Sequence, residues 1–286
     1  MANANINKLI SDAGHELREV GIDAGTVEAE LILCELLDIE RLKLYLDGGT
    51  LVMPEILKKF YEIVDKRKTR YPLQYILGSA WFYGRKFIVN ESVMVPCPET
   101  EILLDCVLRT ARQMNKKPVR LLDLGTGSGV VAVSARLENE NIEVTASDIS
   151  DDALGVAREN ASRLGALDLN FVRSDLFESI DEKLKFDIIA SNPPYIKDDD
   201  YDGLPPEVKA DPQISLLAGS SGMDIIEKLV RQAPDYLNRP GSLIFEIGYD
   251  QAELIFEMVD ADPRYSGCAL LKDLADIDRV VICKLS

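Results

Sequence analysis

The chain has 286 residues, of which 47% are hydrophobic and 28% charged, so it is long enough for two globular domains with full cores. It has no run of 18 apolar residues and no signal-peptide pattern at its N-terminus, which indicates neither a membrane span nor secretion. We therefore expect a cytoplasmic protein, and a monomer. The net charge of −17 lies almost wholly after residue 90, where 20 basic residues face 36 acidic ones, so most of this surface would repel nucleic acid.

The five cysteines are odd in number, scattered along the chain and without a CxxC pair. This usage argues against a disulfide framework and against a zinc site. We expect reduced cysteines, mostly in the core, and no bound metal. The residues are Cys34, Cys97, Cys106, Cys268 and Cys283.

Residues 1–70 predict a small helical domain. Apolar residues recur at helical spacing over 4–20 and 26–38, a short helical turn follows at 42–46, and Pro54 suits the first position of a helix that runs to about residue 70. Basic residues gather between positions 58 and 70. They form either a solvated helix face or a docking patch for an acidic or ribonucleoprotein-associated partner.

Residues 71–90 change to a strand-like pattern. Segments 73–78 and 81–89 predict two strands about a turn, and we interpret this hairpin as a linker between domains. A helix is predicted from residue 102 to about 114, with Pro98 and two glutamates in a suitable position for its first turn. One interpretation of Glu99 and Thr100 is therefore a capping arrangement with no further role.

The third region, residues 91–286, alternates strands and helices after residue 118. Such alternation predicts an α/β fold with right-handed crossovers and a mostly parallel sheet covered on both faces. The last two short strands have too little chain between them for a helical crossover, so they should pair as a hairpin and leave one antiparallel strand. The expected strands are 119–124, 143–147, 168–172, 186–190, 242–247, 269–271 and 280–284, and the expected helices are 129–138, 151–164, 222–237 and 250–260.

A glycine loop, DLGTGSG, joins the first of these strands to its helix. Glycines let the backbone approach a ligand closely, and the helix N-terminus offers unpaired N–H groups at the edge where α/β sheets bind cofactors. The spacing is GxGxG rather than the GxGxxG of dinucleotide folds, and the carboxylate before it favours a cationic ligand over a pyrophosphate. The candidate cofactor-binding residues of the loop are Asp123, Gly125, Thr126, Gly127 and Gly129.

Two further aspartates follow the next strands. Asp148 stands where a carboxylate can hold both ribose hydroxyls of a nucleoside, although it could instead cap the helix that starts near residue 151. Asp175 could accept a hydrogen bond from an adenine amine, or could be a plain loop residue. A cationic, ribose-containing ligand points to S-adenosylmethionine as the cofactor.

The segment SNPPY at 191–195 follows a strand that should be buried. The Asn192 side-chain oxygen and the Pro193 carbonyl could each accept one N–H of a planar amide, while Tyr195 stacks on its face and Pro194 stiffens the backbone. The plainer interpretation is a rigid loop start, because proline restricts the residue before it. The glycine loop upstream favours a substrate site, with Asn192 close to the cofactor as well.

Six motifs occur in order across nearly the whole chain. They are residues 72–78, 96–100, 123–129, 192–195, 246–248 and 278–280, and together they resemble the HemK family of glutamine methyltransferases. The resemblance implies a class I S-adenosylmethionine-dependent methyltransferase fold, Rossmann-like, behind an N-terminal helical domain that helps hold the substrate. It also implies methylation of the glutamine in the Gly-Gly-Gln loop of peptide chain release factors, with Glu99 and Thr100 among the substrate-binding residues. One departure is Cys97, where the family usually has arginine.

The expected reaction is a direct in-line methyl transfer to the amide nitrogen. Hydrogen bonds from the two N–H groups to Asn192 and Pro193 would orient the nitrogen and weaken its delocalisation, so no histidine or lysine base is needed.

Other functions remain open on the sequence. The same segment could hold the amine of a flipped adenine in a DNA methyltransferase, although the acidic surface disfavours this. A non-catalytic module that binds the cofactor, and a nicotinamide-dependent oxidoreductase, fit the motifs less well. Residues 196–221 are too long for a simple connection, and either form a substrate lid or are disordered.

Overall fold

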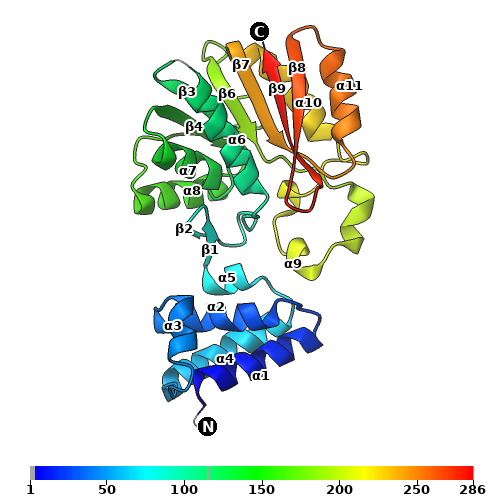
Figure 1. Cartoon of the computed structure of the whole chain (residues 1–286). Helices are drawn as coiled ribbons and strands as arrows, with labels where there is room; N and C mark the ends of the chain where they lie inside the picture. Colours follow the sequence, from blue (N-terminus) through cyan, green and yellow to red (C-terminus); the bar gives the residue numbers. More distant parts are fainter. Residues whose placement is uncertain (1–3, 115, 286) are drawn as a thin grey trace. The chain divides into compact units, whose positions relative to one another are not determined.

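The computed structural model describes residues 4–114 and 116–285, and the chain divides into two compact units (Figure 1). The helical unit contains the described residues up to Gly78 together with the short segment 205–210. The sheet unit contains residues 79–204 and the described residues from Asp211 onward. This division differs from the expected boundaries at 70 and 90: the hairpin belongs to the sheet unit, and the helical unit is discontinuous in sequence.

The helical unit has the helices that its apolar spacing predicts. Asn5 caps the first of them, its side chain accepting a hydrogen bond from the Lys8 N–H at 2.9 Å, and Pro54 occupies the first turn of the fourth. Side chains such as Leu9, Leu33 and Phe60 are fully buried in one apolar cluster. The elements are α1 (Ile6–Glu19), α2 (Gly25–Leu37), α3 (Arg41–Leu46), α4 (Pro54–Lys68) and α5 (Leu73–Leu77).

The strand predicted over 73–78 was wrong, because this segment is the one-turn helix α5. Pro72 precedes the turn, and Gly78 ends it in the left-handed region at a φ of 70°. Leu73 and Tyr75 are buried at adjacent positions of the alternating pattern, which is why the spacing alone resembled a strand. The flanking proline and glycine are the usual signals of a helix start and stop.

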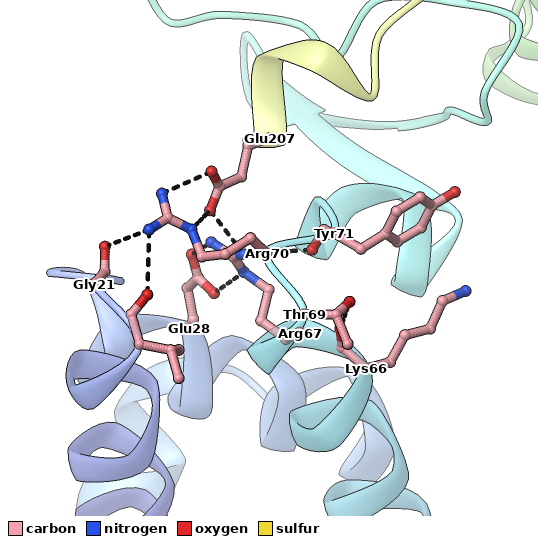
Figure 2. A network of polar contacts seen from close by, with 9 residues as sticks. Gly21, Glu28, Lys66, Arg67, Thr69, Arg70, Tyr71 and Glu207 are labelled. Carbon is pink, nitrogen blue, oxygen red and sulfur yellow. Dashed lines mark hydrogen bonds and ion pairs between the residues drawn. The ribbon is translucent and has the colours of Figure 1, made fainter. Parts of the chain in front are cut away.

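The basic cluster at the end of α4 is neither a solvated face nor an open docking patch at its centre. Arg67 is only 4% exposed, and its guanidinium donates to Glu28 at 2.7 Å and to Glu207 at 2.9 Å. Arg70 donates to both carboxylate oxygens of Glu207, at 2.6 and 2.8 Å, and to the carbonyl of Gly21 at 3.1 Å (Figure 2). The acidic partner of this cluster thus comes from α9 (Pro206–Lys209) of the same chain.

The sheet unit contains a seven-stranded sheet with the order β5-β4-β3-β6-β7-β9-β8. Strand β9 pairs antiparallel with both of its neighbours, so the sheet has the one antiparallel strand that the short C-terminal hairpin predicted. The strands are β3 (Val119–Leu124), β4 (Ile142–Asp148), β5 (Asn170–Arg173), β6 (Phe186–Ser191), β7 (Leu237–Glu246), β8 (Tyr265–Lys272) and β9 (Asp278–Leu285).

Helices cover both faces of this sheet, because its central strands are apolar on both sides. Leu121 and Ile188 belong to an apolar cluster with α6 (Thr100–Gln113), α7 (Val130–Glu138) and α8 (Asp151–Leu164). Their neighbours Leu122 and Ile189 belong to a second cluster with α10 (Asp224–Tyr236) and α11 (Ala252–Asp260). Continuous apolar strands of this kind are typical of a parallel sheet between two helix layers.

A separate hairpin precedes the sheet, formed by β1 (Ser79–Phe82) and β2 (Arg85–Ile88). The prediction of one strand over 81–89 was therefore wrong, because the turn of the hairpin lies inside this segment. Tyr83 and Gly84 turn the chain with positive φ angles of 49° and 72°, as a tight hairpin requires. The Phe82 and Phe87 rings meet edge to face at 6.2 Å and join the cluster of α6 and α7.

The long segment after residue 195 follows a defined path, through η1 (Asp198–Gly203), α9 and η2 (Gln213–Ser215). Its ends are held together, because the Ile196 N–H donates to the Leu216 carbonyl at 2.9 Å and the Ala218 N–H donates to the Ile196 carbonyl at 2.9 Å.

In the part of the chain that the structure describes, no helix is both long and apolar enough to cross a bilayer.

Candidate functional site

A cavity of about 540 Å³ lies in the sheet unit at the carboxyl ends of β3, β4 and β6. This is the edge of a parallel α/β sheet at which ligands usually bind. Most of the residues selected from the sequence line it. They are Thr100, Asp123, Gly125, Thr126, Gly127, Asp148, Asp175, Asn192 and Pro194.

The glycine loop forms one wall of the cavity. Gly125 and Gly127 have φ angles of 70° and 55°, which residues with a Cβ rarely adopt. Asp123 holds the loop in this shape: one of its oxygens accepts from the Thr126 hydroxyl at 2.7 Å and from the Ala132 N–H at 3.2 Å. Burial raises the pKa of Asp123 to about 6, against the lowering effect of these two hydrogen bonds.

Gly129 has a different role from the other glycines of the loop. It precedes α7 with a φ of 82°, and a Cβ there would stand 3.1 Å from the Cβ of Ala157 in α8. It is not among the residues that line the cavity. Its glycine is therefore explained by backbone conformation and helix contact rather than by a ligand.

Asp148, at the end of β4, is half-buried and braced by the backbone. Its oxygens accept from the Gly127 and Ser150 N–H groups, both at 2.9 Å. The cap of α8 is Ser150, whose hydroxyl accepts from the Ala153 N–H at 3.2 Å, so the capping interpretation of Asp148 is wrong. Burial raises the pKa of Asp148, and the backbone hydrogen bonds oppose that rise. Each carboxylate oxygen can accept a second hydrogen bond, because it has two lone pairs.

Apolar side chains were missed by the sequence analysis at this rim. Ile149 and Leu176 both line the cavity, and each directly follows one of the two rim aspartates, Asp148 and Asp175. The signal that could have revealed them is their position, one residue past the end of a strand beside a candidate hydrogen-bonding group. Such a pair of apolar side chains can enclose a flat ring whose polar edge meets a carboxylate.

The segment after β6 is held by a chain of hydrogen bonds. The Asn192 side-chain nitrogen donates to the Thr100 hydroxyl at 3.0 Å, and this hydroxyl donates to one oxygen of Glu246 at 2.9 Å. The Tyr195 hydroxyl lies 3.4 Å from the other oxygen of Glu246. Thr100 therefore connects the start of α6 to the segment 192–195, which is more than the capping role that one interpretation gave it.

Tyr195 and Pro193 do not line the cavity in the described structure. The Tyr195 ring lies against the apolar cluster of α10 and α11, with its hydroxyl directed to Glu246. Burial raises the pKa of this phenol far above its ordinary value, and the nearby Glu246 adds to the rise. Tyr195 thus holds the segment 192–195 from the side of α10 and α11, and not from the cavity.

Glu99 and Cys97 lie just before α6. Glu99 is the N-cap of this helix, yet its side chain makes no capping hydrogen bond, and it does not line the described cavity. Cys97 is half-buried, and its thiol contacts the Val95 carbonyl at 3.6 Å. Burial raises the pKa of this thiol to about 12, with further contributions from Glu246 and Glu99, so it stays protonated at neutral pH.

The sheet order with its single antiparallel strand, together with the glycine-loop cavity at the strand ends, defines a class I methyltransferase fold. Residues 8–78 match the model of the PrmC N-terminal domain, and residues 99–203 match that of the methyltransferase small domain. A release factor glutamine methyltransferase of Neisseria gonorrhoeae is 39% identical over 90% of this chain and 93% of its own. One of Bacillus cereus is 34% identical over 94% of this chain and 95% of its own. The chain belongs to this family of glutamine methyltransferases, also called HemK.

Solved structures agree with the fold. A methyltransferase from Pyrococcus furiosus superposes with a TM-score of 0.52, at 18% identity, over 71% of this chain and 90% of that one. At this identity the likeness concerns the fold alone.

Proposed function

We propose that this chain transfers a methyl group from S-adenosylmethionine to the side-chain amide nitrogen of the glutamine in the Gly-Gly-Gln loop of peptide chain release factors. The observation that carries the proposal is the held amide of Asn192. Its nitrogen is engaged by Thr100, and Asn192 lines the cavity. The relatives that match nearly the whole chain are named for the same reaction class.

The cavity fits the proposed methyl donor by its chemistry. Asp148 has lone pairs left for the two ribose hydroxyls, and the positive-φ glycines at 125 and 127 allow close approach of the ligand. Ile149 and Leu176 would enclose the adenine ring, with Asp175 at its amine edge. When bound, the donor supplies an electrophilic methyl group on a sulfonium.

Asn192 and Pro193 would orient the substrate amide. Because the Asn192 nitrogen donates to Thr100, its oxygen is the end left to accept an N–H from the substrate glutamine. The Pro193 carbonyl would accept the second N–H. An amide nitrogen is a poor nucleophile, since its lone pair is delocalised, so fixing both N–H groups both aims the nitrogen and assists the loss of that delocalisation.

Tyr195 and Glu246 would support the site without contacting the substrate, because neither lines the cavity. The sequence predicted that Tyr195 stacks on the substrate; in the structure its hydroxyl lies 3.4 Å from Glu246, and the residue does not line the cavity. We therefore propose that Tyr195 fixes the backbone of the segment 192–195, while the apolar cavity wall excludes water from the amide. The proton leaves the nitrogen after it has gained the methyl group, when it has become strongly acidic.

The test is mass spectrometry of a purified release factor incubated with this protein and S-adenosylmethionine. We expect one added methyl on the Gly-Gly-Gln glutamine. In Asn192→Ala an N–H of the substrate is left without its acceptor, at about 1 to 3 kcal/mol, so the rate should fall roughly tenfold to a hundredfold.

The matched control is Asn170→Ala, because Asn170 is an exposed asparagine on β5 outside the cavity lining. It should keep the wild-type rate. Methyl on duplex DNA in a parallel reaction, with none on the release factor, would replace the proposal by adenine methylation. A cytoplasmic location and a monomeric state go with this proposal and stay predictions.

A further inference from the structure

Glu246 is the last residue of β7, is only 2% exposed, and is the partner of two residues of the site. One oxygen accepts from the Thr100 hydroxyl at 2.9 Å, and the other lies 3.4 Å from the Tyr195 hydroxyl. Glu246 does not itself line the described cavity. It is therefore a buried acid that touches the supports of the site rather than the space a substrate would fill.

The hydroxyl of Thr100 stands between Glu246 and Asn192, and it has only one proton. A carboxylate accepts hydrogen bonds and cannot donate them, so Thr100 gives this proton to Glu246. Only the lone pairs of Thr100 are then left for Asn192. The amide must present its NH2 to Thr100, as it does at 3.0 Å, and its oxygen must be directed elsewhere.

We infer that Glu246 is a positioning residue: its carboxylate, acting through the Thr100 hydroxyl, fixes the orientation of the Asn192 amide so that the oxygen is offered to the substrate. This inference rests on the proposed function and assigns the orientation of its key residue to a side chain that never meets the substrate. Either orientation of a free asparagine amide occupies almost the same space, so shape alone would not select one.

The orientation holds only while Glu246 is an acceptor. A protonated Glu246 could donate to Thr100, which could then turn its own proton toward Asn192. The amide oxygen would be drawn to Thr100, and the NH2 would replace it at the substrate. An N–H facing the N–H of the substrate glutamine repels it, so a neutral Glu246 should lower the rate.

Burial and the neighbouring charges together allow Glu246 to take up a proton near neutral pH. Burial raises its pKa to about 7, although the Thr100 hydrogen bond and the charge of Arg279 in β9 oppose the rise. Glu99 of α6 adds to it. The remaining titratable neighbours, Cys97 and Tyr195, are neutral at this pH because burial raises both of their pKa values.

Arg279 does not neutralise the site fully. Its guanidinium donates to Asp273 at 3.1 Å, so the nearest cation already has an acid of its own. Among the hydrogen bonds and ion pairs of the described residues, Glu246 has hydroxyl donors and no basic partner.

The first measurement is kcat for release factor methylation between pH 6 and 9. Wild type should lose activity toward acid pH as Glu246 takes up its proton, by up to about tenfold at pH 6. Glu246→Gln cannot titrate, so its profile should be flat over this range, with a rate at pH 8.5 between about twofold and tenfold below wild type, because its amide can present either end to Thr100. Glu253→Gln removes the same charge from an exposed position on α11 and should keep the wild-type profile.

Thr100→Val removes the hydroxyl that connects Glu246 to Asn192, while the size of the side chain changes little. It should abolish the acid limb as Glu246→Gln does, and the double variant should be no slower than the slower single variant, since both changes break one pathway. An acid limb that persists in either variant would contradict the inference. Calorimetric binding of S-adenosylhomocysteine to each variant shows whether its fold is retained.

The second measurement needs no turnover and no variant of Glu246. The side-chain NH2 signals of Asn192 in a ¹H–¹⁵N spectrum are those missing in Asn192→Ala, and they should shift with pH in the same range as the rate. Signals that stay constant from pH 6 to 8.5 would overturn the inference. A wild type that methylates no release factor would refute the proposed function, while this titration would still decide the role of Glu246.

Discussion

Two carboxylates, the partly exposed Glu207 and the buried Glu246, have opposite surroundings. Glu207 of the helical unit is held by the guanidinium groups of Arg67 and Arg70 (Figure 2), whereas Glu246 of the sheet unit is held by hydroxyls. Burial acts to raise the pKa of both. The hydrogen bonds from the arginines outweigh it at Glu207, whose pKa falls to about 2, but the pKa of Glu246 rises to about 7.

The comparison separates a structural acid from a functional one. A carboxylate with two fixed cations stays ionised at every physiological pH, so it can act only as an anchor. A carboxylate with hydroxyl partners can change its protonation state near neutral pH, and such groups concentrate at functional sites. Four substitutions test this difference between the two acids.

The largest effect is expected from Glu207→Gln, which removes the charge between two arginines. A pKa lowered from 4.5 to about 2 corresponds to about 3 kcal/mol of stability at neutral pH. Because the folded-state pKa is lowered, this stability is present above pH 4.5 and is lost as pH falls toward 2. Urea unfolding at pH 7 and pH 3 measures it; equal loss at both values would contradict the anchoring role.

Glu246→Gln should act in the opposite direction on stability. Its folded-state pKa is raised from 4.5 to about 7, so wild type loses stability as pH rises through this window. The variant lacks this loss and should gain about 2 kcal/mol relative to wild type between pH 5 and pH 8. Thermal unfolding of both proteins across the range tests this, and parallel curves would show that Glu246 is already ionised at pH 5.

Cys97→Arg would give Glu246 a cation of the kind that Glu207 has. The HemK family usually has arginine at this position, and Glu246 is close enough to Cys97 for its charge to raise the pKa of the thiol. An opposite charge nearby should lower the pKa of Glu246 by about one unit. The acid limb of the rate profile should move to lower pH by the same amount. An unmoved limb would mean that the new guanidinium does not face Glu246.

The smallest effect is expected from Arg70→Lys, which keeps the positive charge but loses the guanidinium that donates to both oxygens of Glu207. Arg70 binds both oxygens of Glu207 and also the carbonyls of Val20 and Gly21, and a lysine cannot reproduce these bonds together. We expect a loss of about 1 kcal/mol in urea unfolding. Lys58→Arg on the exposed face of α4 is the control and should leave the midpoint unchanged. A loss as large as that of Glu207→Gln would mean that fork geometry, rather than charge, holds α9.

The sequence was sufficient to predict the features that come from a repeating pattern or from residues adjacent in the chain. Alternating strands and helices predicted the parallel sheet, and the short link between the last two strands predicted the antiparallel one. The segment 73–77 was misread because its alternating apolar residues outweighed the flanking Pro72 and Gly78. The glycine loop and the segment 192–195 were recognisable because their chemistry is contiguous in the chain.

The rest depended on contacts between distant residues. Glu246 lies 146 positions from Thr100 and 51 from Tyr195, so the motif at 246–248 marks the residue but not the two hydroxyls that it supports. Glu207 lies 140 positions from Arg67, and their pairing explains why Arg67, at the centre of an apparent surface patch, is buried. Neither role has a short-range pattern from which it could be predicted.

The discontinuous helical unit sets a rule for dividing this protein into fragments. A chain cut after Gly78 would leave α9, with Glu207, on the other fragment, so the isolated first piece would expose Arg67 without one of its acids. A useful split-protein design would instead supply residues 205–210 in trans, as a short peptide with the sequence of that segment. The helical unit is thus a fold completed from elsewhere in the chain rather than an appendage that can be removed by shortening the gene.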